Sequence, residues 1–263
     1  MDLSASIVDF YSRYDEAGRL DRRPSTRLER IRTLELLEHY LPTPAAVLDV
    51  GGGPGAYAAP LLAAGHRVRL VDLVPAHVAQ ARAAVPGLDA VVGDARDLPS
   101  GDGEWDATLL FGPLYHLLDR SDRVRALREA VRVTRPGGLV LAAAISRFAA
   151  SFDFVVRDRL TERTLADSRR LLTDGANDPG TGFTHAWFHR VPELVAECAE
   201  AGLTPVEVHG VEGPLWTAVE TSGDDPGVFD GALEMARLYS TEPALLAASA
   251  HLLVAGRRPP VRG

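Results

Sequence analysis

Short, continuously apolar segments that alternate with predicted helices constrain the fold of this chain of 263 residues most strongly. Strands are predicted at 46–50, 67–71, 90–92, 107–111 and 139–144, with helices at 55–64, 75–84 and 122–134 between them. Strands that alternate with helices form βαβ units, which pair into a parallel sheet with right-handed crossovers. Because these strands are apolar throughout, we expect helices on both faces of the sheet.

Further elements are expected on both sides of this unit. Residues 1–44 predict a helical cap, with helices at 5–20 and 26–41 and a Thr26–Glu29 capping box at the start of the second. Residues 146–190 interrupt the alternation and predict a lid insertion with two helical stretches, placed over the carboxyl edge of the sheet. Residues 191–263 predict a helix at 192–202, strands at 204–210 and 251–256, and further helical segments between them. Together with the cofactor-binding half at 45–145, we expect a single domain.

Composition excludes several classes of partner. The formal net charge is -8 and the pI about 5.5, which disfavours nucleic acid. The arginines at 123–135 predict a solvated helix face. The single cysteine, Cys198, excludes an intrachain disulfide, and its apolar helical surroundings favour a buried structural thiol. No apolar run approaches the ~20 residues of a membrane span. We therefore expect a cytoplasmic protein without a membrane partner, and composition leaves its oligomeric state open.

The stretch VLDVGGGPGAY, residues 47–57, places a glycine-rich turn directly after the first strand. Gly51, Gly53 and Gly55 permit positive φ angles and the close approach of a ligand to the backbone. A helix starting near Gly55 would point its free N–H groups at that ligand. The turn indicates a nucleotide site without saying which nucleotide, and since the string also fits G-x-G-x-x-A, NAD is a real alternative; a tight turn without a ligand is the other.

Two acidic positions follow the next strands. Asp72 ends the second strand in VRLVDLVP, where a carboxylate can accept both hydroxyls of a ribose, a feature common to both cofactors. Asp94 follows the third strand in VVGDARDLP, where it can accept a hydrogen bond from an adenine amine while the backbone at Ala95 meets the ring. This third signal favours S-adenosylmethionine.

Five ordered motifs between residues 45 and 145 resemble the class I S-adenosylmethionine-dependent methyltransferases: VLDVGGGPG, LVDLVP, GDARDLP, WDATLLFGPLYHL and RVTRPGGLVLAA. The resemblance implies an α/β, Rossmann-like, doubly wound sheet of seven strands in the order 3-2-1-4-5-7-6, with strand 7 antiparallel. The strands at 204–210 and 251–256 supply the last two.

The resemblance also implies the residues that bind the cofactor. The glycine turn would surround its methionine portion, Asp72 its ribose, and Asp94 its adenine, while the end of strand four lies beside the sulfonium. Tyr11, Tyr14 and Arg19, from the N-terminal helices, would close over it. The expected set is Tyr14, Arg19, Asp49, Gly51, Gly52, Gly53, Gly55, Asp72, Leu73, Asp94, Ala95, Phe111, Gly112 and His116.

Methyl transfer is an in-line displacement with a neutral leaving group, so the enzyme mainly aligns the acceptor and excludes water. The loop FGPLYHL lacks the [ND]-P-P-[YF] pattern of methyltransferases that act on DNA bases or amides, which favours a small-molecule acceptor. Tyr115 and His116 are expected where cofactor and acceptor meet, with His116 as a base or orienting group. Arginine without lysine is also typical of high-GC genomes, where many such enzymes act in secondary metabolism.

Residues after the fifth strand supply further candidates. His185 and His189 in THAWFHR are expected in the lid, lining the acceptor pocket with Trp187 and Phe188, and plain lid packing is the alternative. Their spacing of four fits a metal site on a helix, but no third ligand is near in the sequence, so no metal is expected. Glu212 and Trp216 in EGPLW are candidates for the pocket wall.

Two other functions remain open on the sequence. An NAD-dependent oxidoreductase would use the same glycine turn. The GDARDLP loop argues against this function, and so does the absence of lysine from the sequence, which rules out a Tyr-x-x-x-Lys pair. A non-catalytic protein that binds S-adenosylmethionine would need no acceptor pocket. The nature of the acceptor atom is not determined by the motifs.

Overall fold

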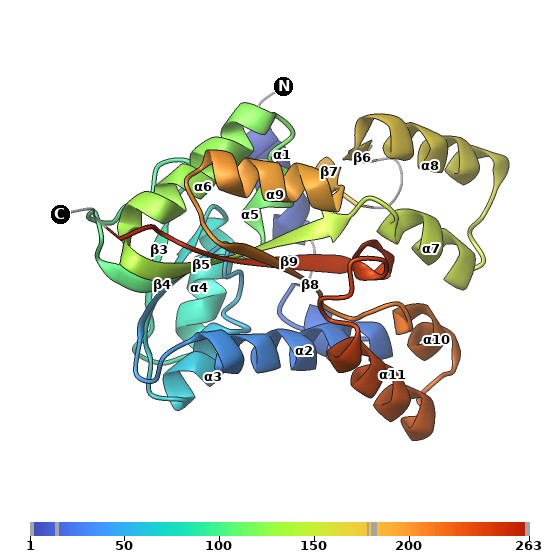
Figure 1. The fold of residues 1–263 in the computed structure, drawn as a ribbon, viewed down its shortest axis with the longest axis horizontal. Coiled ribbons are helices and arrows are strands. Elements are labelled where there is room, and N and C mark those ends of the chain that lie inside the picture. Colours follow the sequence, from blue (N-terminus) through green and yellow to red (C-terminus); the bar gives the residue numbers. More distant parts are fainter. Residues whose placement is uncertain (1–2, 14–15, 178, 180–182, 261–263) are drawn as a thin grey trace.

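The computed structural model describes residues 3–13, 16–177, 179 and 183–260, and a mostly parallel β-sheet forms its centre (Figure 1). The seven main strands are β1 (Ala46–Val50), β2 (Arg67–Asp72), β3 (Asp89–Val92), β4 (Trp105–Leu110), β5 (Thr134–Ser146), β8 (Val206–Gly210) and β9 (His251–Arg257). Their order across the sheet is β3-β2-β1-β4-β5-β9-β8, and β9 runs antiparallel to both of its neighbours. With β8 and β9 counted as the sixth and seventh strands, the predicted order 3-2-1-4-5-7-6 is confirmed.

Helices cover both faces of the sheet (Figure 1). On one face, α6 (Arg120–Val133) and α9 (Val191–Glu200) pack in the core that contains Leu48 and Val50. On the other face, α2 (Pro24–Tyr40), α3 (Ala58–Ala63) and α4 (Pro75–Ala84) pack in the core that contains Val47. Since successive residues of a strand point to opposite faces, two buried faces require continuously apolar strands. The doubly wound prediction is confirmed.

The N-terminal elements differ in detail from those predicted. The helix expected at 5–20 is divided into α1 (Leu3–Arg13) and the 3-10 helix η1 (Arg19–Asp21). Helix α2 begins at Pro24 and its capping box joins Arg23 to Thr26, so the predicted Thr26–Glu29 box is wrong. Proline is favoured in the first turn of a helix, which moves the start two residues earlier.

The insertion at 146–190 contains the two predicted helices, α7 (Ala149–Val156) and α8 (Glu162–Asp174), and also a β-hairpin that was not predicted. The hairpin joins β6 (Ala176–Asn177) to β7 (Ala186–His189), and β7 pairs in parallel with the last two residues of β5. His189 therefore ends a strand and His185 precedes it, so the helical spacing that a metal site would need does not occur.

Short elements complete the described chain: α5 (Pro113–His116), α10 (Trp216–Thr221), α11 (Pro226–Leu238) and η3 (Leu246–Ala248). Within the described ranges, no helix is long and apolar enough to cross a membrane. Cys198 is fully buried in α9, and burial raises the pKa of its thiol to about 12, in agreement with a structural role.

A buried ion pair joins α6 to α9. The side chains of Arg123 and Glu197 are each 2% exposed, and Nη2 of the arginine donates to Oε1 of the glutamate at 2.8 Å. Arg123 Nη1 also donates to the carbonyl oxygens of Leu117 and Leu118, which follow α5. The prediction of a solvated face is therefore wrong for Arg123, because its guanidinium is buried and hydrogen-bonded to the residues that follow α5.

Replacing Arg123 with Met should lower the free energy of unfolding by about 3–5 kcal/mol, because the change leaves Glu197 buried without its main partner. Urea denaturation measures this loss. The matched control is Arg128→Met on the same helix, where the arginine side chain is 58% exposed and pairs with Glu200 at 3.3 Å. The control should lose less than about 1 kcal/mol. Equal losses in the two variants would contradict the assignment.

Candidate active site

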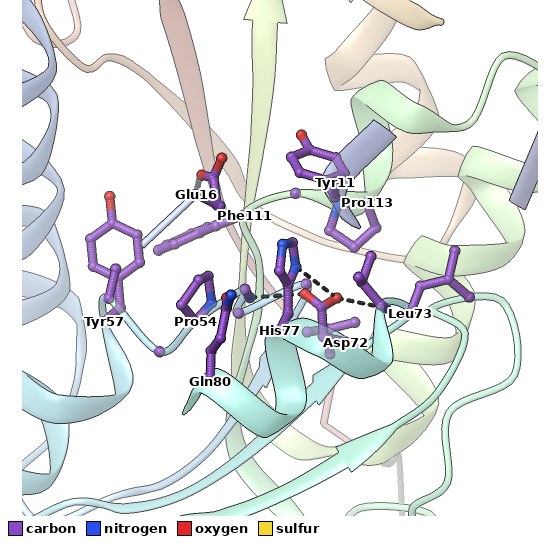
Figure 2. A pocket seen from close by; sticks show the side chains of 18 of the residues that line it. Tyr11, Glu16, Pro54, Tyr57, Asp72, Leu73, His77, Gln80, Phe111 and Pro113 are labelled. Atoms are coloured by element: carbon purple, nitrogen blue, oxygen red, sulfur yellow. Dashed lines mark hydrogen bonds and ion pairs between the residues drawn. The ribbon is translucent and has the colours of Figure 1, made fainter. Parts of the chain in front are cut away.

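A cavity of about 390 Å³ lies at the carboxyl ends of β1, β2 and β4 (Figure 2). Its wall is built from the loops after these strands and after β3, and from residues of α1, η1 and the segment between them. Twelve of the fourteen residues predicted to bind the cofactor lie in this wall. They are Arg19, Gly51, Gly52, Gly53, Gly55, Asp72, Leu73, Asp94, Ala95, Phe111, Gly112 and His116. Tyr115 also lines it, Asp49 lies just outside the wall, and Tyr14 falls outside the described residues.

The backbone of the glycine turn packs closely against the loop after β4 and against the end of β2. Gly51 has a φ of +73°, and a Cβ there would lie 2.5 Å from Pro113 Cδ. The Gly53 N–H donates to Asp72 Oδ2 at 2.8 Å. The turn continues to Tyr57 and α3 begins at Ala58, since Gly55 has a φ of +91°, which an α-helix does not accommodate. The predicted helix start near Gly55 is wrong, and the backbone of the turn itself faces the cavity.

Asp49 lies beneath this turn with a fully buried carboxyl group. Neither carboxyl oxygen has a hydrogen-bond partner within the part of the chain that the structure describes. A Cβ on Gly52 would lie 2.5 Å from Asp49 Oδ2, so only glycine fits between the carboxyl and the cavity. Burial and the nearby Asp72 raise the pKa of Asp49 to about 7. An unpartnered acid under a glycine cradle fits a site that a ligand completes.

Asp72 joins three elements at the floor of the cavity. Besides the Gly53 bond, its Oδ1 accepts the Val74 N–H at 2.8 Å and lies 3.2 Å from Nδ1 of His77. Figure 2 shows the His77 ring rising from α4 beside Asp72 into the cavity. Sequence reasoning missed His77, although a histidine in the first turn after the acidic strand end was a visible signal.

Asp94 lies in the wall and is held by its neighbour Arg96. Arg96 Nη2 donates to Asp94 Oδ2 at 2.6 Å, and the Arg96 N–H donates to Oδ1 at 2.8 Å. Burial opposes ionisation of Asp94, but these hydrogen bonds lower its pKa overall. Arg96 Nη1 also donates to Asp122 at 2.7 Å. Asp94 is therefore an ionised and oriented acceptor at the edge of the cavity.

His116 and Tyr115 stand at the opposite side, in α5. The hydroxyl of Tyr11, from α1, lies 2.9 Å from His116 Nε2. Burial lowers the pKa of His116 to about 4, against smaller opposing effects of the His185 backbone and Asp72. Burial also raises the pKa of Tyr11 well above its usual value. The pair is therefore a neutral imidazole beside a neutral phenol.

A charge network lies behind the N-terminal part of the wall. Arg19 donates to both oxygens of Glu29 at 2.8 Å and to Glu16 at 2.8 Å. Glu29, Glu212 and His251 bring one ligand atom each within 4.8 Å of one another, as a metal site would. Although burial favours the neutral ring, Glu29 and Glu212 raise the pKa of His251 to about 9. Arg19 and the protonated His251 therefore already balance the two carboxylates.

Several residues predicted for the pocket lie elsewhere. His189 is fully buried, and its Nε2 lies 3.2 Å from Glu197 Oε2. Glu212 accepts the Ser249 hydroxyl at 2.7 Å within the network behind the wall. Trp216 is buried and donates to the Ala248 carbonyl at 3.1 Å. His189, Glu212 and Trp216 therefore do not line this cavity, and for His189 the alternative of packing within the insertion describes its place. His185 approaches His116 through its backbone.

Comparison with known proteins decides the family. The family model for a methyltransferase domain matches residues 47–138. A demethylmenaquinone methyltransferase of Beutenbergia cavernae is 34% identical over 166 residues, which cover 61% of this chain and 67% of that protein. The chain belongs to the class I S-adenosylmethionine-dependent methyltransferases. Its cofactor is S-adenosylmethionine, so the NAD alternative falls away. The chain spans 42% of the length of several other relatives, which are mycobacterial methyltransferases.

Solved structures agree with this assignment at the level of the fold. A methyltransferase of Thermotoga maritima, described as a possible histamine N-methyltransferase, matches with a TM-score of 0.62 and 18% identity, covering 97% of this chain and 99% of that one. The N-methyltransferase NodS of Bradyrhizobium japonicum, solved with S-adenosylhomocysteine, matches with a TM-score of 0.60 and 17% identity, covering 98% and 100%.

The raised pKa of Asp49 predicts a pH dependence of stability. Its pKa is about 7 in the folded protein and about 4 in an unfolded chain, so the folded state binds more protons between these values. The contribution of Asp49 to the free energy of unfolding should therefore fall as pH rises from about 4 to about 7, by roughly 2–4 kcal/mol. The Asp49→Asn variant lacks this contribution, so the stability of the original protein relative to the variant should fall between pH 5 and pH 8, as urea denaturation of both would show.

The control is Asp106→Asn. The Ala46 N–H and Arg135 lower the pKa of Asp106, so this carboxyl stays ionised across the whole window. The difference in stability between this variant and the original protein should be the same at both pH values. A wild-type pH profile that runs parallel to that of Asp49→Asn would contradict the prediction.

Proposed function

We propose that this methyltransferase transfers a methyl group to a nucleophilic atom of a small molecule and releases S-adenosylhomocysteine. The observation that carries the proposal is the neutral, buried His116 in the wall of a small cavity covered by α1 and η1. When bound, the cofactor supplies an electrophilic methyl carbon, which bonds to the acceptor atom while the electron pair of the broken C–S bond stays on sulfur. A cavity lined by several elements suits this reaction, which requires that the acceptor is aligned and that water is excluded.

The wall residues that were predicted from the sequence form the proposed binding site. The glycine turn would hold the methionine portion, with Arg19 beside it. Asp72 and Leu73 would hold the ribose, and Asp94 and Ala95 the adenine. Phe111 and Gly112 would lie next to the sulfonium. This assignment is supported by the common cavity that all of these residues line.

His116 and Tyr11 are proposed to handle the proton of the acceptor. The imidazole of His116 is unprotonated at neutral pH and can accept a proton, and its burial makes it a weaker base than an exposed histidine. The Tyr11 hydroxyl lies 2.9 Å from its Nε2 and also lines the cavity. An acceptor hydroxyl that donates to Tyr11 could therefore lose its proton through Tyr11 to His116 Nε2. Tyr115 would pack beside them without taking part in proton transfer, because its hydroxyl already donates to the Phe111 carbonyl at 3.2 Å.

An aromatic acceptor suits this side of the cavity best. Tyr11, Tyr115 and Phe183 surround His116, with ring centroids 5.4, 4.7 and 6.0 Å from its own. Aromatic rings pack on one another in edge-on and offset arrangements. The Beutenbergia relative is named for a quinone substrate, which supports the same class. The net charge of -8 argues against nucleic acid as the acceptor.

The test is a mass-spectrometric screen of the purified protein with S-adenosylmethionine. The candidate acceptors are hydroxylated naphthalenes, reduced quinones, phenols, amines and thiols, with total tRNA as a separate arm. We expect a methylated product from the hydroxylated aromatic compounds, formed in equal amount with S-adenosylhomocysteine. Methylation of tRNA without any small-molecule product would overturn the proposal.

Substitutions at the proton acceptor test its role. With the acceptor found in the screen, His116→Asn should lower kcat by about 10²–10⁴-fold if the imidazole is the general base. Tyr11→Phe should lower kcat in the same direction. Affinity for S-adenosylhomocysteine, measured by calorimetry, should fall by a smaller factor than kcat in both. His39→Asn, at an exposed position on α2, is the control. Unchanged kcat in His116→Asn would refute the role.

A further inference from the structure

His77 is a polar side chain in the cavity whose function the family motifs do not explain. It belongs to the first turn of α4, is 4% exposed, and lines the cavity. Its Nε2 has no hydrogen-bond partner anywhere in the described chain. Figure 2 shows the ring standing in the cavity between Pro54 and Leu73, with Asp72 at its base. A buried ring nitrogen without a partner is costly, so a ligand group that pairs with it would be favoured.

The hydrogen bonds that Asp72 already makes limit how many ligand groups it can bind. A carboxylate oxygen can accept about two hydrogen bonds. Oδ1 already accepts from Val74 at 2.8 Å and faces His77 Nδ1 at 3.2 Å, while Oδ2 accepts from Gly53 at 2.8 Å. Only one position, on Oδ2, is left for a ligand. The expectation that Asp72 alone accepts both hydroxyls of a ribose therefore does not fit its surroundings.

We propose that His77 and Asp72 share the ribose of the cofactor, with one hydroxyl donating to Asp72 Oδ2 and the other to His77 Nε2. The inference rests on S-adenosylmethionine as the cofactor of the proposed function. Asp72 is an acceptor, so the ring nitrogen that faces it, Nδ1, carries the proton. With the ring proton on Nδ1, Nε2 is the acceptor of the ring, which matches a hydroxyl donor.

Calorimetry with S-adenosylhomocysteine and its 2′-deoxy and 3′-deoxy analogues tests this division. In the original protein each missing hydroxyl should weaken binding by about 5–20-fold, because each leaves a buried acceptor unpaired. The key variant is His77→Asn, whose amide nitrogen can replace Nδ1 toward Asp72 but which has no group at the position of Nε2. It should bind S-adenosylhomocysteine about 5–10-fold more weakly.

The test depends on how much affinity each deoxy analogue loses in each variant. In His77→Asn the loss caused by one of the two deoxy analogues should disappear, while the loss caused by the other, which reports on Asp72, should persist. His77→Gln reaches the position of Nε2 with an amide oxygen, so it should retain both losses. His77→Leu has no hydrogen-bonding group at either ring position, and it replaces His77→Asn if that variant does not fold. His39→Asn, exposed on α2, should match the original protein throughout.

The outcomes separate this inference from the proposed function. If S-adenosylhomocysteine binds to the original protein but His77→Asn shows both losses unchanged, the shared ribose site is refuted while the cofactor stands. The same holds if His77→Asn binds S-adenosylhomocysteine as tightly as the original protein. If the original protein does not bind S-adenosylhomocysteine at all, the proposed function fails first.

Discussion

The hydrogen bond from the Gly53 N–H to Asp72 is the contact on which the rest of the site depends. It joins the turn after β1 to the end of β2, two neighbouring strands whose carboxyl ends meet at one edge of the sheet. The same carboxylate also holds the start of α4 through the Val74 N–H. With these bonds formed, the floor of the cavity is set before any ligand arrives, which lowers the ordering that binding must otherwise impose.

The cover of the cavity is held by charge rather than by apolar packing alone. Arg19 lies in the wall and pairs with Glu29 of α2, and Glu29 faces His251 at the start of β9. His251 in turn pairs with Glu212, which follows β8. This chain of alternating charges connects the N-terminal cover to the last two strands of the sheet. Buried charges of this kind require partners on all sides, and here each carboxylate has a cation against it.

The candidate site could be predicted to different degrees in its different parts. The glycine turn, Asp72 and Asp94 follow directly from their positions after predicted strands, and all three reach the cavity. The histidines were harder to place. His116 lies in one of the five motifs and borders the cavity, whereas His189 lies in the insertion and is buried against Glu197 of α9. The sequence offered both as candidates, because the packing that separates them is a property of the folded chain.

By itself, the sequence determined the alternation of strands and helices and therefore a parallel sheet, because these properties depend on local periodicity and on residues a few positions apart. The order of the strands and the identity of the cofactor turn followed from the resemblance of five ordered motifs to a known family. Only the tertiary structure decided that Arg123 is buried, that Arg19 pairs with Glu29, and that His77 stands beside Asp72 with a ring nitrogen that pairs with none of the described residues. Each of these depends on contacts between separate elements, and neither propensity nor spacing records which side chains such contacts bury.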